Sequence, residues 1–103
     1  MQTTNPVDAE IRVLQKESRT AETLQITYTF YRITTPTSTY YAAEIAAGEE
    51  CDMQVLGSDS RRAEKLFEIL VNETVTPCTL REILYDIETE EEKNRYRENL
   101  CKI

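Results

Sequence analysis

Residues 63–87 read AEKLFEILVNETVTPCTLREILYDI, and this stretch decides the architecture of the C-terminal half. Two sets of four apolar residues recur there with the spacing i, i+3, i+4, i+7, which places each set on one face of an α-helix. The sets are Ala63, Leu66, Phe67, Leu70 and Leu80, Ile83, Leu84, Ile87. Two amphipathic helices are therefore expected, the second covering residues 80–87.

Capping residues predict where these helices begin and end. Ser58 is the expected N-cap of the first helix, which should end near Asn72. Thr76 followed by Pro77 predicts the start of the second helix, because proline at the first helical position loses no hydrogen bond. The pair Thr79–Glu82 offers a competing start of the capping-box type.

Residues 24–31 alternate between apolar and polar side chains, which is typical of a β-strand with one buried face. Weaker alternation marks residues 10–16, and similar alternation marks residues 41–45 and 51–55. Polar segments separate these strands, and residues 18–22 are expected to form a hairpin loop. Short connections favour antiparallel pairing, since parallel strands need long crossovers.

We therefore predict one α+β domain over residues 9–88, an antiparallel meander of three or four strands with two C-terminal helices packed on one face. Residues 1–8 are expected to be a disordered leader, and residues 89–103 a charged, helical C-terminal extension. The predicted core contains Leu24, Ile26, Tyr28, Phe30, Tyr41, Ile45, Val55, Leu66, Phe67, Leu70, Leu80, Ile83, Leu84 and Ile87.

The overall charge argues against a nucleic-acid partner. The chain carries 19 acidic and 12 basic residues, a net charge of −7, and so gains nothing from a phosphate backbone. The two helices superficially resemble a helix-turn-helix, but the outward positions of the second, from Arg81 to Glu88, are mostly acidic or neutral. DNA binding is thus the least favoured hypothesis.

Composition also limits the chemistry that the chain can perform. Histidine, the commonest general base and nitrogen ligand of metals, is absent. Two glycines leave no material for a phosphate-binding loop, and the glutamates of residues 88–92 lack the glycine turn of a calcium loop. We expect no enzyme activity, no cofactor and no metal.

Three widely spaced cysteines indicate a reduced protein rather than a disulfide framework. No apolar run is long enough to span a membrane, and residues 1–8 do not resemble a signal peptide, so a cytoplasmic location is expected. Cys78 falls on the first turn of a predicted helix, where a thiol pKa can be lowered. A small thiol enzyme or redox sensor using Cys78 is therefore the alternative function.

Hydroxyl-bearing side chains provide the candidate binding residues. Thr27, Thr29 and Tyr31 share one face of their strand, and Tyr40 is expected nearby on the next strand. If both helices cover the opposite face, this face stays open, and tyrosine is enriched at protein interfaces. The favoured hypothesis is a non-catalytic module that binds a protein partner or itself; the simpler alternative is an ordinary solvated sheet face.

Residues 24–87 also resemble a family of short bacterial proteins with a domain of unknown function, found mainly in spore-forming, gut-associated lineages. The resemblance rests on the strands Tyr28–Tyr31 and Tyr41–Ile45, on the helix Lys65–Leu70, and on the segment Val75–Asp86 with its Val-Thr-Pro start. It implies a cytosolic protein of this fold and assigns no activity and no site residue. The charged tail is longer than this family's pattern implies.

Overall fold

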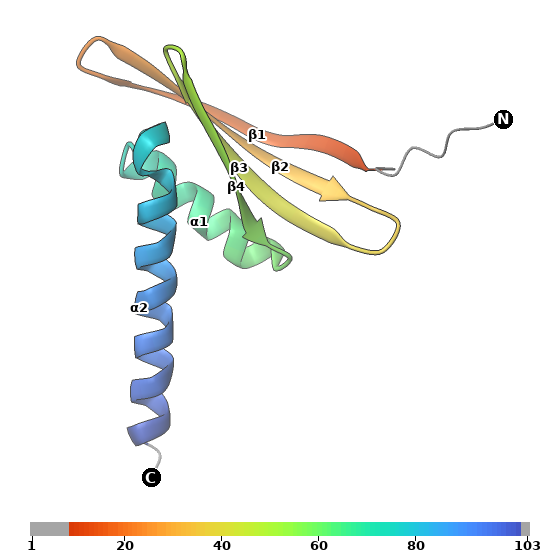
Figure 1. The fold of residues 1–103 in the computed structure, drawn as a ribbon, viewed down its shortest axis with the longest axis vertical. Helices are drawn as coiled ribbons and strands as arrows, with labels where there is room; N and C mark the ends of the chain where they lie inside the picture. The colour runs from red at the N-terminus through yellow and green to blue at the C-terminus, as the bar shows by residue number, and fades with distance from the viewer. Residues whose placement is uncertain (1–8, 102–103) are drawn as a thin grey trace, which may run out of the picture.

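A computed structural model describes the backbone of residues 9–101 and the side chains of residues 9–94, so the predicted leader, residues 1–8, lies outside it. Four strands precede two α-helices and a short 3₁₀-helix (Figure 1). Their bounds are β1 Glu10–Ala21, β2 Leu24–Thr34, β3 Thr39–Ala47, β4 Glu50–Gly57, α1 Ser60–Asn72, the 3₁₀-helix Pro77–Thr79 and α2 Leu80–Cys101.

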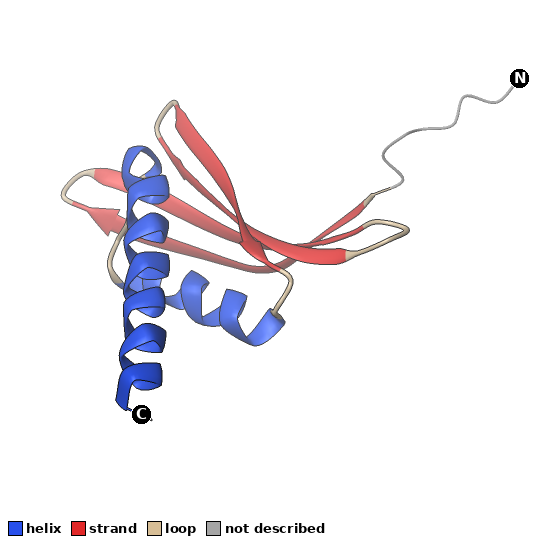
Figure 2. Ribbon diagram, turned by 60° about the horizontal axis from the view of Figure 1, so that its bottom comes forward, coloured by secondary structure: helices blue, strands red, loops and turns tan. Residues whose placement is uncertain are grey.

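The strands form one antiparallel sheet in the order β1-β2-β3-β4, which confirms the predicted meander and settles its strand number at four. Both helices lie on the same side of the sheet, and no described element covers the other side (Figure 2). The predicted α+β class is therefore confirmed. We call the uncovered side of the sheet the open face.

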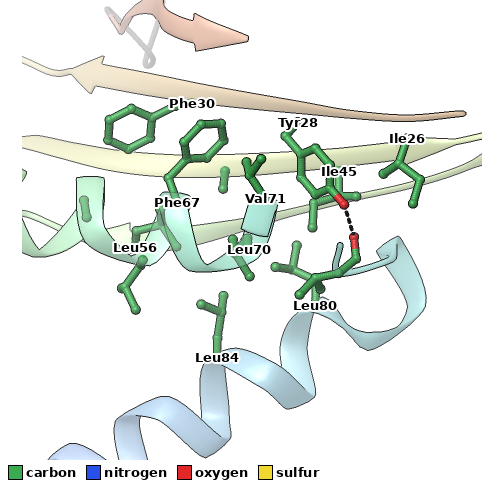
Figure 3. Close-up of a cluster of buried hydrophobic side chains, with 14 of the residues drawn as sticks. Ile26, Tyr28, Phe30, Ile45, Leu56, Phe67, Leu70, Val71, Leu80 and Leu84 are labelled. Atoms are coloured by element: carbon green, nitrogen blue, oxygen red, sulfur yellow. Dashed lines mark hydrogen bonds between the residues drawn. The ribbon is translucent and has the colours of Figure 1, made fainter. Parts of the chain in front are cut away.

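The core lies between the sheet and α1, with the 3₁₀-helix and the start of α2 closing one end (Figure 3). The first apolar set of the sequence, Ala63, Leu66, Phe67 and Leu70, is buried throughout. In the second set Leu80 and Leu84 are buried, while Ile83 and Ile87 pack against the core from a half-buried position. The i, i+3, i+4, i+7 pattern thus predicted both contact faces.

Two members of the predicted core are wrong. Leu24 is exposed near the β1–β2 turn, and Val55 lies on the open face, where 60% of it is accessible. Leu56 is buried in place of Val55, because Val55 pairs with Ala42 on the open face and the alternation of β4 then points Leu56 toward the helices. The period of two was visible in β4, but the period alone does not say which set of side chains is buried.

Several predicted boundaries also need correction. Residues 18–21 continue β1 instead of forming a loop, and the hairpin turns at Glu22, which has a left-handed φ of 58°. Asp59 rather than Ser58 caps α1, because its carboxylate accepts hydrogen bonds from the backbone N–H groups of Arg61 and Arg62 at 3.0 and 3.2 Å.

The break between the helices is held by a threonine pair. The backbone N–H of Thr76 donates to Oγ1 of Thr79 at 3.3 Å, and the two hydroxyls lie 3.0 Å apart. Pro77 opens the short 3₁₀-helix there, and α2 follows at Leu80. The predicted start at Thr76-Pro77 is therefore confirmed, with a 3₁₀ turn ahead of the α-helix.

Helix α2 continues past Ile87, where its apolar set ends, and projects beyond the sheet (Figure 1). An ion pair ties this projecting part to α1: the Arg62 guanidinium donates from Nη2 and Nε to the two carboxylate oxygens of Glu91 at 2.7 and 3.2 Å. Arg62 also donates to the carbonyl of Leu56 at 3.2 Å. The start of the charged tail is therefore tied to α1 at Glu91 by an ion pair.

Candidate protein-binding face

The open face is built from four rows of side chains that run across the strands. Paired residues on neighbouring strands point to the same side of a sheet, so the register defines each row. The rows are Ile11-Ile33-Tyr40, Val13-Tyr31-Ala42-Val55, Lys16-Thr29-Glu44-Met53 and Ser18-Thr27-Ala46-Cys51.

The four candidate residues all lie on this face, one in each row. Tyr40 pairs with Ile33 and therefore shares the side of Tyr31, as expected. Thr29, however, is buried among its neighbours, and Thr27, Tyr31 and Tyr40 are only partly exposed. The hydroxyl groups are thus grouped as predicted, but they make up less of the accessible surface than the alternation suggested.

Four apolar side chains outside the predicted set are more accessible than the hydroxyl-bearing candidates. Ile11, Val13 and Val55 are 61%, 55% and 60% exposed, and Met53 is 44% exposed. Three of them lie in the first two rows, where they flank Tyr31, Ile33 and Tyr40. The alternation of residues 10–16 and 51–55 shows these side chains in the sequence, but it places Val55 in the predicted core and assigns Ile11, Val13 and Met53 to no surface.

A small polar network lies beside these apolar rows. The hydroxyl of Tyr31 donates to the Glu44 carboxylate at 3.1 Å, and the Cys51 thiol donates to its other oxygen at 3.4 Å. Burial, followed by the hydrogen bond to Glu44, raises the pKa of the Tyr31 phenol. Partial burial and the same carboxylate raise the pKa of the Cys51 thiol. The network therefore favours the protonated form of both donors.

Cys78, the residue of the alternative function, lies away from the open face. Its thiol is exposed on the 3₁₀-helix, 3.5 Å from Oγ1 of Thr76. Cys78 and Cys51 both line an open pocket of about 530 Å³ between the β3–β4 turn and the start of α2. The pocket is also bordered by four acidic residues and Arg81, and it contains no general base suited to a thiol.

The described side chains contain no group of three or more histidine, cysteine, aspartate or glutamate residues placed to hold a metal ion. Within the same part of the chain, no helix combines the length and apolarity needed to cross a bilayer.

No protein-family model, no curated protein and no solved structure matches this chain. The resemblance to the family of short bacterial proteins therefore stays a prediction, and the functional argument depends on the open face alone.

Proposed function

We propose that this protein is a non-catalytic binding module that recognises a protein surface through its open face. The observation that carries the proposal is the row Val13-Tyr31-Ala42-Val55, which crosses all four strands with an apolar or aromatic side chain at every position. Val13 and Val55 at the two ends of the row are 55% and 60% exposed and Tyr31 is partly exposed, whereas Ala42 is fully buried. Exposed apolar side chains of this kind are costly in water and favour burial against another surface.

The side chains of this row suit an interface. Tyr31 combines a large ring with a hydroxyl already satisfied by Glu44, so its ring can be buried without an unpaired polar group. Val13 lies beside it on β1, and Val55 lies on β4 beyond Ala42. An aromatic anchor surrounded by smaller apolar contacts is the usual arrangement of an interface centre.

An affinity capture with matched variants tests the proposal. The wild type and the variants Val13→Lys and Val55→Lys are immobilised, and proteins bound from an extract of the native host are compared with those bound by Tyr85→Lys. Tyr85 is 68% exposed on α2, so its substitution changes an exposed apolar residue away from the open face.

The proposal is supported if the wild type and Tyr85→Lys capture the same protein and both valine variants lose it. The purified partner should then reproduce this pattern of binding to the open face. Equal binding by all four proteins, or no specific binding together with a strictly monomeric wild type, contradicts it. Thiol chemistry at Cys78 stays the alternative; an alkylation rate ordinary for an exposed thiol would argue against it.

A further inference from the structure

We infer that the partner of the open face is a second copy of this chain, packed face to face across a two-fold axis. This inference deepens the proposed function and depends on it. Three features of the face point to this occupant: its charge, the order of its apolar side chains and its area.

The open face differs from the rest of the molecule in its net charge. The paired positions of its four rows include one basic residue, Lys16, and one acidic residue, Glu44, and these lie in the same row. The chain as a whole has a net charge of −7, so its acidic excess lies elsewhere. Two copies can therefore approach by this face without bringing like charges together, whereas a strongly basic partner would be drawn to the other surfaces.

The order of the apolar side chains in the second row suits a two-fold arrangement. An axis parallel to the strands and between β2 and β3 would lay β2 on β3 of the second copy, and β1 on its β4. Tyr31 would then face Ala42 of the second copy, and Val13 would face its Val55. Ala42 is fully buried within its own chain, so Tyr31, Val13 and Val55 would make the contacts of this row. The two-fold axis thereby places apolar side chains of one sheet opposite apolar side chains of the other, as in two packed sheets.

The area of the open face is also close to that buried on one partner of a standard interface. Strands of this length, spaced about 4.8 Å apart with a rise of about 3.3 Å per residue, give a sheet face of roughly 600 Å². Standard interfaces bury about 800 Å² on each partner. The open face therefore approaches the area of a specific interface without help from other surfaces.

The edges of the sheet are less suited to pairing between copies. β1 is interrupted by a register shift between Val13 and Gln15, with Leu14 as the extra residue, and it carries Arg12, Lys16 and Arg19. Bulges and basic side chains are common protection against edge-to-edge pairing. At the other edge, β4 is in contact with the 3₁₀-helix and α2.

Analytical ultracentrifugation of the full chain, from about 1 µM to about 1 mM, tests this inference, since that range covers weak to moderate affinities. The wild type should be a reversible dimer. Val55→Lys should weaken the dimer at least about tenfold, because two uncompensated ammonium groups would enter the interface. Tyr85→Lys should leave the dissociation constant unchanged, and thermal melts of each variant verify that it folds.

A charge variant with its matched control tests the same face without altering its packing. Lys16→Glu and Lys65→Glu lower the net charge of the chain equally, but Lys65 is exposed on α1. Lys16→Glu should weaken the dimer about tenfold more than Lys65→Glu, because only the former makes the face acidic.

A wild type that remains monomeric throughout the concentration range overturns the inference, as does a dimer that Val55→Lys and Lys16→Glu leave intact. Failure of the inference is distinct from failure of the proposed function. A monomer that still captures another protein in a manner lost in Val55→Lys refutes self-association and retains the binding role, whereas a monomer without such capture refutes both.

Discussion

The phenol of Tyr28 is the buried polar group that joins the two layers of the molecule. Its hydroxyl donates to the backbone carbonyl of Val75 at 3.0 Å, across a gap of 47 residues in the sequence (Figure 3). The ring itself is fully buried between the sheet and the helices. The bond therefore anchors the segment between α1 and the 3₁₀-helix to the centre of β2.

Removing that hydroxyl should measurably destabilise the fold. Tyr28→Phe keeps the ring but leaves the carbonyl of Val75 without its partner, which should lower the free energy of unfolding by about 1–3 kcal/mol. Urea denaturation followed by circular dichroism measures the change. Tyr85→Phe, an exposed tyrosine on α2, is the control and should shift stability by less than about 0.5 kcal/mol. An equal effect of both substitutions would contradict the role of the bond.

The raised pKa of Tyr28 predicts how the stability of the fold changes at alkaline pH. Burial raises the pKa of Tyr28 above its ordinary value of 10.0, with the charge of Arg19 opposing the shift, and the pKa of Tyr31 is also raised. Above pH 10 the unfolded chain releases these protons before the folded chain does, so stability is present below pH 10 and falls as pH rises through the folded pKa. The fall should be shallower in Tyr28→Phe than in wild type, which denaturation at a series of pH values above 9 would measure.

Thr74 has an unfavourable backbone conformation that a substitution should relieve. It follows α1 with a left-handed φ of 53°, and Val75 donates to the carbonyl of Leu70 at 3.0 Å, which is the arrangement that usually has glycine at this position. A β-branched residue is strained there. Thr74→Gly should therefore raise stability by up to about 1 kcal/mol in thermal or urea denaturation, whereas Thr79→Gly should lower it by removing the contact with Thr76.

At the scale of elements, the ion pair between Arg62 and Glu91 should couple α1 to the projecting part of α2. Both side chains are about one-third exposed, so we expect a coupling energy near 0.5–1 kcal/mol rather than the value of a buried pair. A double-mutant cycle of Arg62→Gln and Glu91→Gln measures it, and 1 M salt should reduce it. A coupling energy of zero at low salt would show that charge does not dock the tail.

The sequence predicted helices better than it predicted the sheet, for a physical reason. A helix with one apolar stripe, such as the Leu66-Phe67-Leu70 face, has only one way to bury it. A strand such as β4 has two faces, and its alternation alone does not say whether Val55 or Leu56 is buried; the pairing of Val55 with Ala42 on β3 decides it. The docking of Arg62 on Glu91 was equally hidden, because it joins residues 29 positions apart.

At the scale of the whole molecule, the sequence predicted which side of the sheet carries the candidate residues, but not the apolar side chains that accompany them. Alternation placed Thr27, Thr29, Tyr31 and Tyr40 on the side away from the helices, and the register agrees. The first two rows of the open face could not be predicted without knowing how the four strands pair, because each strand contributes only one or two of their residues. No pattern within a single strand reveals a row that runs across a sheet.

The distribution of charge over the whole molecule predicts how salt should affect the inferred dimer. Two chains of net charge −7 repel each other, while the face between them holds Lys16 and Glu44 in balance. Raising the salt from about 0.05 to about 0.5 M shortens the range of this repulsion and leaves apolar contacts intact, so the dimer should tighten several-fold. Lys65→Glu, which adds negative charge away from the face, should steepen this dependence. Sedimentation equilibrium at a series of salt concentrations measures both effects. A dimer that weakens with added salt would instead be held together by ion pairs, which contradicts an interface formed by the apolar rows of the open face.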